Sequence, residues 1–154
     1  MKICDMYDHN DAYIILKNKN KIWNEIYCTF NNSLIFGKVK PNKIKLYLSK
    51  ELNKLGWADR VRIHNNHNLT IGFLKDKVGI CIQLGNVART YADLLKLTYL
   101  CDKGITDLGV IFVPDALESK IMGGNYARFD RFVRDLEVFR EIINIPMLII
   151  SLGN

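Results

Sequence analysis

Apolar residues follow a helical period in the first third of the chain. From Ile22 to Phe30, and again from Lys43 to Leu55, they recur every three to four positions, which predicts two helices that each bury one face. Gly56 directly follows the second run and favours the end of a helix there. The basic segment 38–42, which contains a proline, predicts a loop between the two helices.

From residue 69 onward, short apolar runs alternate with longer amphipathic ones. Leu69–Leu74 and Val78–Leu84 are typical of β-strands, and the polar turn Lys75-Asp76-Lys77 between them predicts a hairpin. The pattern then predicts a helix, a strand, a helix and a last buried strand, over Val87–Leu100, Gly109–Pro114, Asn125–Ile143 and Pro146–Leu152. Strands that alternate with helices imply an α/β fold, in which helices flank both faces of a mixed β-sheet.

Composition narrows the class of protein without identifying it. The 154 residues fit one domain spanning 1–154, and a hydrophobic content of 49% excludes an intrinsically disordered chain. No apolar run approaches the ~18 residues that cross a bilayer, and the first residues lack the apolar core of a signal peptide. We therefore expect a cytoplasmic protein with no membrane partner and with four reduced cysteines.

The formal net charge of +6 indicates polyanions as a class of partner. Excess Lys and Arg attract polyanions, because the neutralisation of phosphates releases condensed counterions. Double-stranded DNA is one such polyanion, although charge by itself does not distinguish it from others.

The predicted hairpin carries a more specific signal. Residues 70–86 resemble the catalytic hairpin of the BglII/BstYI group of type II restriction endonucleases, which belong to the PD-(D/E)xK class. The group's pattern is an Asp, nine residues later a Glu-x-Gln, and then a short turn that ends in Asn; Gln83 and Asn86 match it. Residues 86–97 are similar to the helix that follows, and Ile111–Pro114 to the next strand. The resemblance implies a restriction-endonuclease-like fold and a nuclease ancestry.

The acids of that pattern are replaced in this chain. The resemblance expects Asp at position 72 and Glu at position 81, and the sequence has Gly72 and Cys81. Glycine offers no side-chain ligand, and a thiol is a poor partner for Mg²⁺, which prefers oxygen. Of the three catalytic positions only Gln83 matches, so we expect impaired catalysis and no cofactor as the chain stands, with Mg²⁺ only if it is active.

Three alternatives stay open for the missing acids. In the first, the alignment is shifted so that Asp76 serves, although that residue lies in the predicted turn. In the second, the acid has moved to Glu25 or Asp93, and a solvated helix position is the competing interpretation of Asp93. In the third, the substitutions were introduced in the laboratory.

Basic and polar residues near the hairpin are the candidates for contacts with DNA phosphates. They are Lys75, Lys77, Asn86, Arg89, Lys96, Lys120, Asn125 and Arg128. Gly123 and Gly124 beside Asn125 suit close approach of a phosphate to the backbone. A solvated helix face is the alternative for Arg128 and the arginines that follow it.

Three functions therefore compete. The first is a DNA-binding, catalytically impaired relative of type II restriction endonucleases. The second is an active Mg²⁺-dependent endonuclease with relocated acids, and the third is a protein-interaction module on the same scaffold. We also expect a homodimer, because the predicted helix 87–100 has apolar residues around most of its circumference and needs a second surface to cover them.

Overall fold

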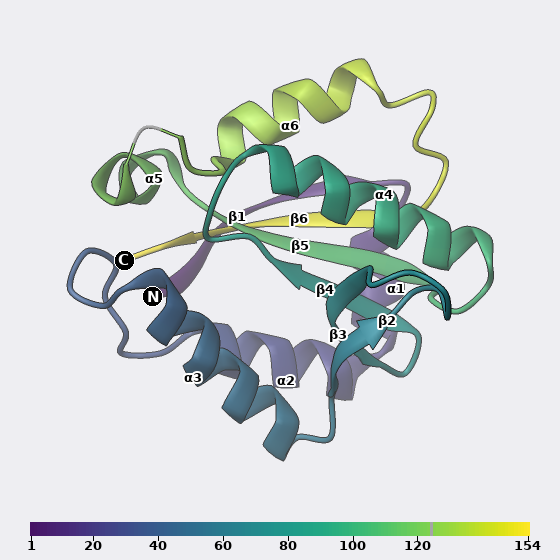
Figure 1. Ribbon diagram of the computed structural model, residues 1–154, viewed down its shortest axis with the longest axis horizontal. Helices are drawn as coiled ribbons and strands as arrows, with labels where there is room; N and C mark the ends of the chain where they lie inside the picture. The colour runs from purple at the N-terminus through teal and green to yellow at the C-terminus, as the bar shows by residue number, and fades with distance from the viewer. Residues whose placement is uncertain (124) are drawn as a thin grey trace.

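A mixed sheet forms the centre of the computed structural model, which describes residues 1–123 and 125–154 (Figure 1). Its strands are β1 (Lys2–His9), β2 (Ala58–Arg62), β3 (Thr70–Lys75), β4 (Val78–Ile82), β5 (Leu108–Pro114) and β6 (Met147–Gly153). They lie in the order β1-β6-β5-β4-β3-β2. The inner strands β4, β5 and β6 are parallel, and β1, β3 and β2 pair antiparallel with their neighbours.

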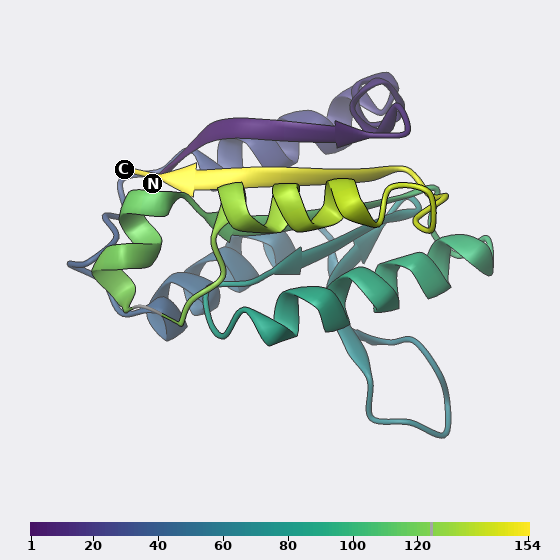
Figure 2. The same ribbon diagram turned by 90° about the horizontal axis from the view of Figure 1, so that it is seen from above.

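Helices cover both faces of this sheet. They are α1 (Ala12–Asn18), α2 (Asn20–Phe30), α3 (Pro41–Lys54), α4 (Ala88–Asp102), α5 (Ala116–Met122) and α6 (Phe129–Val138). Figures 1 and 2 show α2 and α3 on one face and α4 and α6 on the other. The fold class expected from the sequence is confirmed: an α/β fold with a mixed sheet between two helical layers.

Two hydrophobic cores follow from this layering. One joins the N-terminal helices to the sheet, and in it the rings of Phe30 and Phe112 stack with centroids 3.7 Å apart. The other lies under α4 and α6 and contains Leu97 and Phe132. Residues 109–113 of β5 are fully buried, which explains why this strand reads as a continuous apolar run.

The sequence predicted the regular, half-buried elements and missed the polar ones. The hairpin is present, with Asp76 and Lys77 at φ 45° and 62° in the tight turn between β3 and β4. The predicted helix over 125–143 is wrong in extent, because α6 covers only Phe129–Val138. The strands β1 and β2 and the helices α1 and α5 were not predicted. Both strands lie at sheet edges and are mostly exposed, so they lack an apolar alternation.

No helix in the described part of the chain has the length and apolar character needed to cross a membrane. The segment between β2 and β3 is a long loop that protrudes from the body of the molecule (Figure 2).

Candidate nucleic-acid interface

The hairpin brings the expected catalytic positions to one side of the sheet. Cys81 lies in β4 and Gln83 directly after it, and the two point to the same face because strand side chains alternate. Both are buried, with exposed fractions of 2% and 4%. Backbone pairing continues past the end of β4, since the Gln83 N–H donates to the Phe112 carbonyl at 2.8 Å. Gln83 is therefore held rigidly beside α4.

Asp93 of α4 completes this group. Its carboxylate accepts a hydrogen bond from Gln83 Nε2 at 3.0 Å and pairs with Lys96 Nζ at 2.8 Å. The residue is buried, with 8% exposed, so the interpretation of Asp93 as a solvated helix position is wrong. Among the acids considered as relocated ligands, Asp93 is the one that the structure places beside Gln83.

Gly72 of β3 has no room for a side chain. A Cβ atom built on it would meet the Ile80 carbonyl oxygen at 2.8 Å, so an L side chain cannot be added without a backbone shift. On its other side, the register of β2 against β3 places Arg60 opposite Gly72, and Arg60 has φ 50°, a conformation that a non-glycine residue rarely adopts. The absence of a side chain at position 72 is therefore part of how β3 packs.

Cys81 is a neutral thiol in this setting. Burial, followed by the neighbouring Asp93 carboxylate, raises its pKa to about 12. A thiol that keeps its proton is neither a metal ligand nor a nucleophile at neutral pH. The residue acts as a small buried side chain in the same hydrophobic core as Leu94 and Leu97 of α4.

The residues around Gln83 do not fit a Mg²⁺ site. No group of three or more His, Cys, Asp or Glu side chains converges anywhere in residues 1–123 and 125–154. Asp93 is the single carboxylate that lines the hollow beside Gln83, and its oxygens already accept from Gln83 and Lys96. Mg²⁺ needs several hard oxygen ligands, which this arrangement does not supply.

Positive charge dominates the same hollow. It measures about 440 Å³, and four basic side chains line it around Gly72, Cys81, Gln83 and Asp93: Lys45, Arg60, Arg89 and Lys96. We call this site the cationic hollow. Burial lowers the pKa of Lys45, although Asp93 opposes that effect. Arg89 and Lys96 were predicted, whereas Lys45 and Arg60 were missed. The helix α3 carries several lysines, and no sequence signal tells which one turns toward the sheet; Arg60 lies on β2, which was not predicted.

A second hollow, of about 610 Å³, adjoins the first near the start of α4. It shares Lys45 and Arg89 with the cationic hollow and adds Lys40, Asn86 and Asn125, so two more predicted residues lie here. The loop after β4 is fixed in place by the segment after residue 124. The Ala127 N–H donates to the Gly85 carbonyl at 2.7 Å, and Asn86 Oδ1 accepts from the Ala88 N–H at the start of α4.

Four of the residues predicted to contact DNA, Lys75, Lys77, Lys120 and Arg128, do not line these two hollows. Lys75 Nζ pairs with both carboxylate oxygens of Glu25 at 2.8 Å, and Glu25 also accepts from Trp57 Nε1. This nearly buried pair occupies both Lys75 and Glu25, so neither is available to a phosphate or a metal. Asp76 and Lys77 form the hairpin turn at the far end of β4 from Gln83, where Lys77 lies 3.7 Å from Asp107.

Lys120 and Arg128 belong to a separate, small hollow of about 200 Å³ beside Ser119 and Arg131. Arg128 Nε donates to Asp130 at 2.6 Å, so this arginine is partly neutralised. Gly124, predicted to allow close approach of a phosphate, lies outside the described residues.

Comparison with known proteins gives a consistent result. The chain matches the family described as restriction endonuclease BglII/BglIII over residues 4–152. A crystal structure of restriction endonuclease BglII complexed with a DNA 16-mer superposes with a TM-score of 0.82 at 17% identity, covering all of this chain and 77% of that one. Free BglII gives a TM-score of 0.76 at 20% identity, with 100% and 80% of the two chains covered. At these identities the superpositions establish the fold. No curated protein sequence matches.

Proposed function

The chain belongs to the restriction endonuclease BglII/BglIII family, and from that membership we propose that it binds double-stranded DNA while its own metal-dependent cleavage is impaired. The observation that carries the proposal is the charge of the cationic hollow. Four basic side chains surround one carboxylate, and that carboxylate is already paired. Such a surface attracts phosphates and repels the divalent cation that hydrolysis by this class of enzyme needs.

The placement of the remaining candidates supports the same function. Asn86, Arg89, Lys96 and Asn125 lie around two adjoining hollows between α3 and the start of α4, which is an extended basic surface. A backbone of repeated phosphates suits an extended surface better than a single closed pocket does. We propose that residues 1–154 act as one domain in this role, in the reducing cytoplasm that the four free cysteines favour.

Binding and cleavage can be separated in one experiment. Supercoiled plasmid is incubated with the protein in Mg²⁺, and in parallel the affinity for a labelled duplex is measured by anisotropy over a series of salt concentrations. We expect no nicking, and binding whose log–log salt slope is about −4 to −5, which corresponds to roughly four to six neutralised phosphates. Binding that is absent at about 50 mM salt, or insensitive to salt, would contradict the proposal and favour the protein-interaction module.

One observation favours a second candidate, an active endonuclease with a relocated acid. Asp93 is buried against Gln83, where a metal-bound carboxylate could act if Lys96 moved away. The discriminating result is chelator-sensitive cutting by the unaltered chain that disappears in the Asp93→Asn variant. Cutting that survives Asp93→Asn would indicate a contaminating nuclease instead.

We further propose that two copies associate through an apolar groove between α4 and the end of α6. The groove measures about 730 Å³, and Leu95, Val138 and Ile142 in it are exposed by 66%, 77% and 71%. Its one acid, Asp135, accepts a hydrogen bond from Tyr91 and lies 3.9 Å from Arg131 Nε, which offsets its charge. A two-fold axis brings the same patch of both copies together, and a patch with its one charge offset can face itself with little repulsion.

A further inference from the structure

Three cations of the cationic hollow have no acidic partner in the described part of the chain. Lys96 pairs with Asp93, but no carboxylate oxygen in residues 1–123 or 125–154 forms an ion pair with Lys45, Arg60 or Arg89. Like charges gathered around one hollow repel each other, and that repulsion disfavours the free protein. An anion that enters the hollow relieves it.

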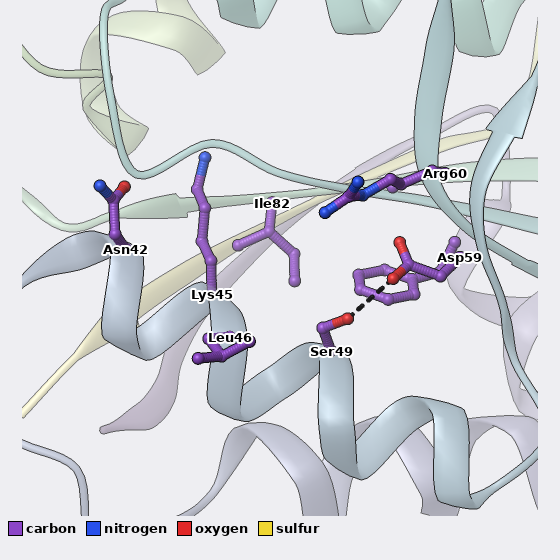
Figure 3. Close-up of a pocket in the computed structure, with 9 residues that line it drawn as sticks. Asn42, Lys45, Leu46, Ser49, Asp59, Arg60 and Ile82 are labelled. Atoms are coloured by element: carbon purple, nitrogen blue, oxygen red, sulfur yellow. Dashed lines mark hydrogen bonds between the residues drawn. The ribbon is translucent and has the colours of Figure 1, made fainter.

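Lys45 has the central position in this arrangement. It lines the cationic hollow, the hollow beside Asn86 and a third hollow of about 420 Å³ between α3 and β2, so its side chain stands where the three meet. Figure 3 shows Lys45 rising from α3 and Arg60 reaching in from β2, with Ile82 between them. Across the three hollows, the basic residues number five and the acidic residues two.

The two acids leave this positive charge largely uncompensated. Asp93 is neutralised by Lys96 on the floor of the cationic hollow. Asp59 accepts a hydrogen bond from Ser49 Oγ at 2.9 Å and lines the hollow drawn in Figure 3, but it does not line the cationic hollow. A divalent cation placed here would meet three unpaired positive charges and one carboxylate that is already in use, whereas a phosphate would meet an ammonium and two guanidinium groups, the donors best suited to its oxygens.

We propose that the cationic hollow binds a phosphodiester group of the DNA backbone directly, without a divalent cation, and that the Lys45 ammonium supplies the positive charge that a metal ion supplies in a metal-dependent nuclease. This inference rests on the proposed DNA binding and deepens it, because it names one phosphate site and the residue at its centre. Without a metal to polarise the phosphodiester, the hollow holds the strand and does not cut it.

The test compares the affinity of Lys45→Gln and Lys50→Gln variants for a labelled duplex. Lys50 is an exposed lysine on the same helix that lines none of the three hollows, so it controls for the loss of one charge. We expect Lys45→Gln to weaken binding about tenfold and to reduce the salt slope by about 0.9, the amount for one phosphate contact, and Lys50→Gln to weaken it less than about threefold. Thermal melts by circular dichroism establish that both variants fold.

The role of the metal is tested with the unaltered protein at constant ionic strength. The duplex affinity in EDTA should lie within about twofold of that in Mg²⁺, because Mg²⁺ acts here only as a screening ion. A strong requirement for Mg²⁺ would overturn the inference. Equal losses of duplex affinity for Lys45→Gln and Lys50→Gln would also overturn the inference. In that case, duplex binding by the unaltered protein would still support the proposed function. If the unaltered protein binds no duplex, both fail.

A further arm distinguishes a DNA phosphodiester from free phosphate. Inorganic phosphate and chloride are compared at equal ionic strength for their effect on the melting temperature and on duplex affinity. We expect phosphate to compete only weakly with the duplex, because a single phosphate gains no contacts outside the hollow. Tight phosphate binding that depends on Lys45, together with duplex binding that does not, would assign the hollow to a small phosphorylated ligand and contradict the inference.

Discussion

At the scale of single residues, the candidate site differs from the catalytic hairpin that the sequence resembles in two ways: in its side chains and in how its backbone packs. The sequence indicated that Gly72 and Cys81 provide no carboxylates. It could not indicate that Gly72 lies against the Ile80 carbonyl or that Asp93 turns inward to Gln83, because both depend on how closely β3, β4 and α4 pack. Lys45 and Arg60 were missed for the same reason, since their positions are set by tertiary contacts.

The stability of the protein at alkaline pH should depend on Cys81. Its pKa is about 12 in the folded protein and near 9.0 when exposed. Because the folded pKa is raised, its contribution to stability is complete below pH 9 and declines as the pH rises toward 12, at about 1.4 kcal/mol per pH unit. Between pH 8 and 10.5 the free energy of unfolding of the unaltered protein should therefore fall by roughly 2 kcal/mol more than that of Cys81→Ala. Urea unfolding at the two pH values measures both.

The control for this prediction is Cys4→Ala, because Cys4 is exposed and its replacement should leave the pH dependence unchanged. Parallel stability curves for Cys81→Ala and the unaltered protein would show that Cys81 titrates normally, and thus that it is not buried as described.

A side chain at position 72 should be costly. Gly72→Ala places a Cβ against the Ile80 carbonyl oxygen, and the strands must separate to admit it, at a cost of about 1–3 kcal/mol in unfolding free energy. Thr70→Ala, a change on the same strand without that contact, should cost less than about 1 kcal/mol. If Gly72→Ala unfolds in urea like the unaltered protein, β3 and β4 are not packed so tightly.

At the scale of elements, the predictable ones were those whose burial follows a regular period. The hairpin and α4 have such a period. The strands β1 and β2 do not, because each lies at an edge of the sheet and exposes most of its residues. The short helix α5 also has no long apolar pattern; it begins at Asp115, whose side chain accepts a hydrogen bond from the Glu118 N–H.

The contact that ties α2 to the end of β3 should contribute strongly to stability. Glu25→Gln leaves the ammonium of Lys75 without its partner in a nearly buried site, where side chains are only 9% and 15% exposed. We expect a loss of about 2–4 kcal/mol, somewhat below the full cost of an isolated buried charge because Lys75 also donates to the Leu55 carbonyl. Chemical denaturation provides the measurement.

The matched control is Glu51→Gln, which breaks the more exposed Glu51–Lys54 pair and should lower the free energy of unfolding far less than Glu25→Gln does. The double variant Glu25→Gln with Lys75→Met should recover part of the loss, because it removes the unpaired charge. Equal effects of Glu25→Gln and Glu51→Gln would mean that the Glu25 pair is effectively solvated.

At the scale of the whole molecule, basic and apolar surfaces occupy different places. The basic hollows lie between α3 and the start of α4, and the apolar groove lies between α4 and the end of α6. The sequence correctly pointed to α4 as an element with more than one apolar stripe. It could not show that the segment after α6 exposes Phe139 and Ile142 beside it, because a longer helix was predicted there.

Self-association through the groove predicts a concentration-dependent mass in sedimentation equilibrium near about 10 µM, approaching twice the 17.8 kDa of one chain. Ile142→Glu should return the protein to a monomer without unfolding it, because the side chain is 71% exposed. Leu117→Glu, equally exposed at 72% but on α5, should leave the dimer intact. A strict monomer of the unaltered protein, free and bound to a palindromic duplex, would exclude a homodimer and leave the groove to another protein.

The close contact at Gly72 also bears on how this position could evolve. If an acid was lost at this position, as our proposal of impaired cleavage implies, β3 and β4 could afterwards pack closely against each other, and an aspartate would no longer fit without a backbone shift. A mutation back to aspartate would be selected against for its effect on folding before any benefit to catalysis could appear. The loss of the nuclease site would then be reversible only in a set order, with a change that reopens the strands first.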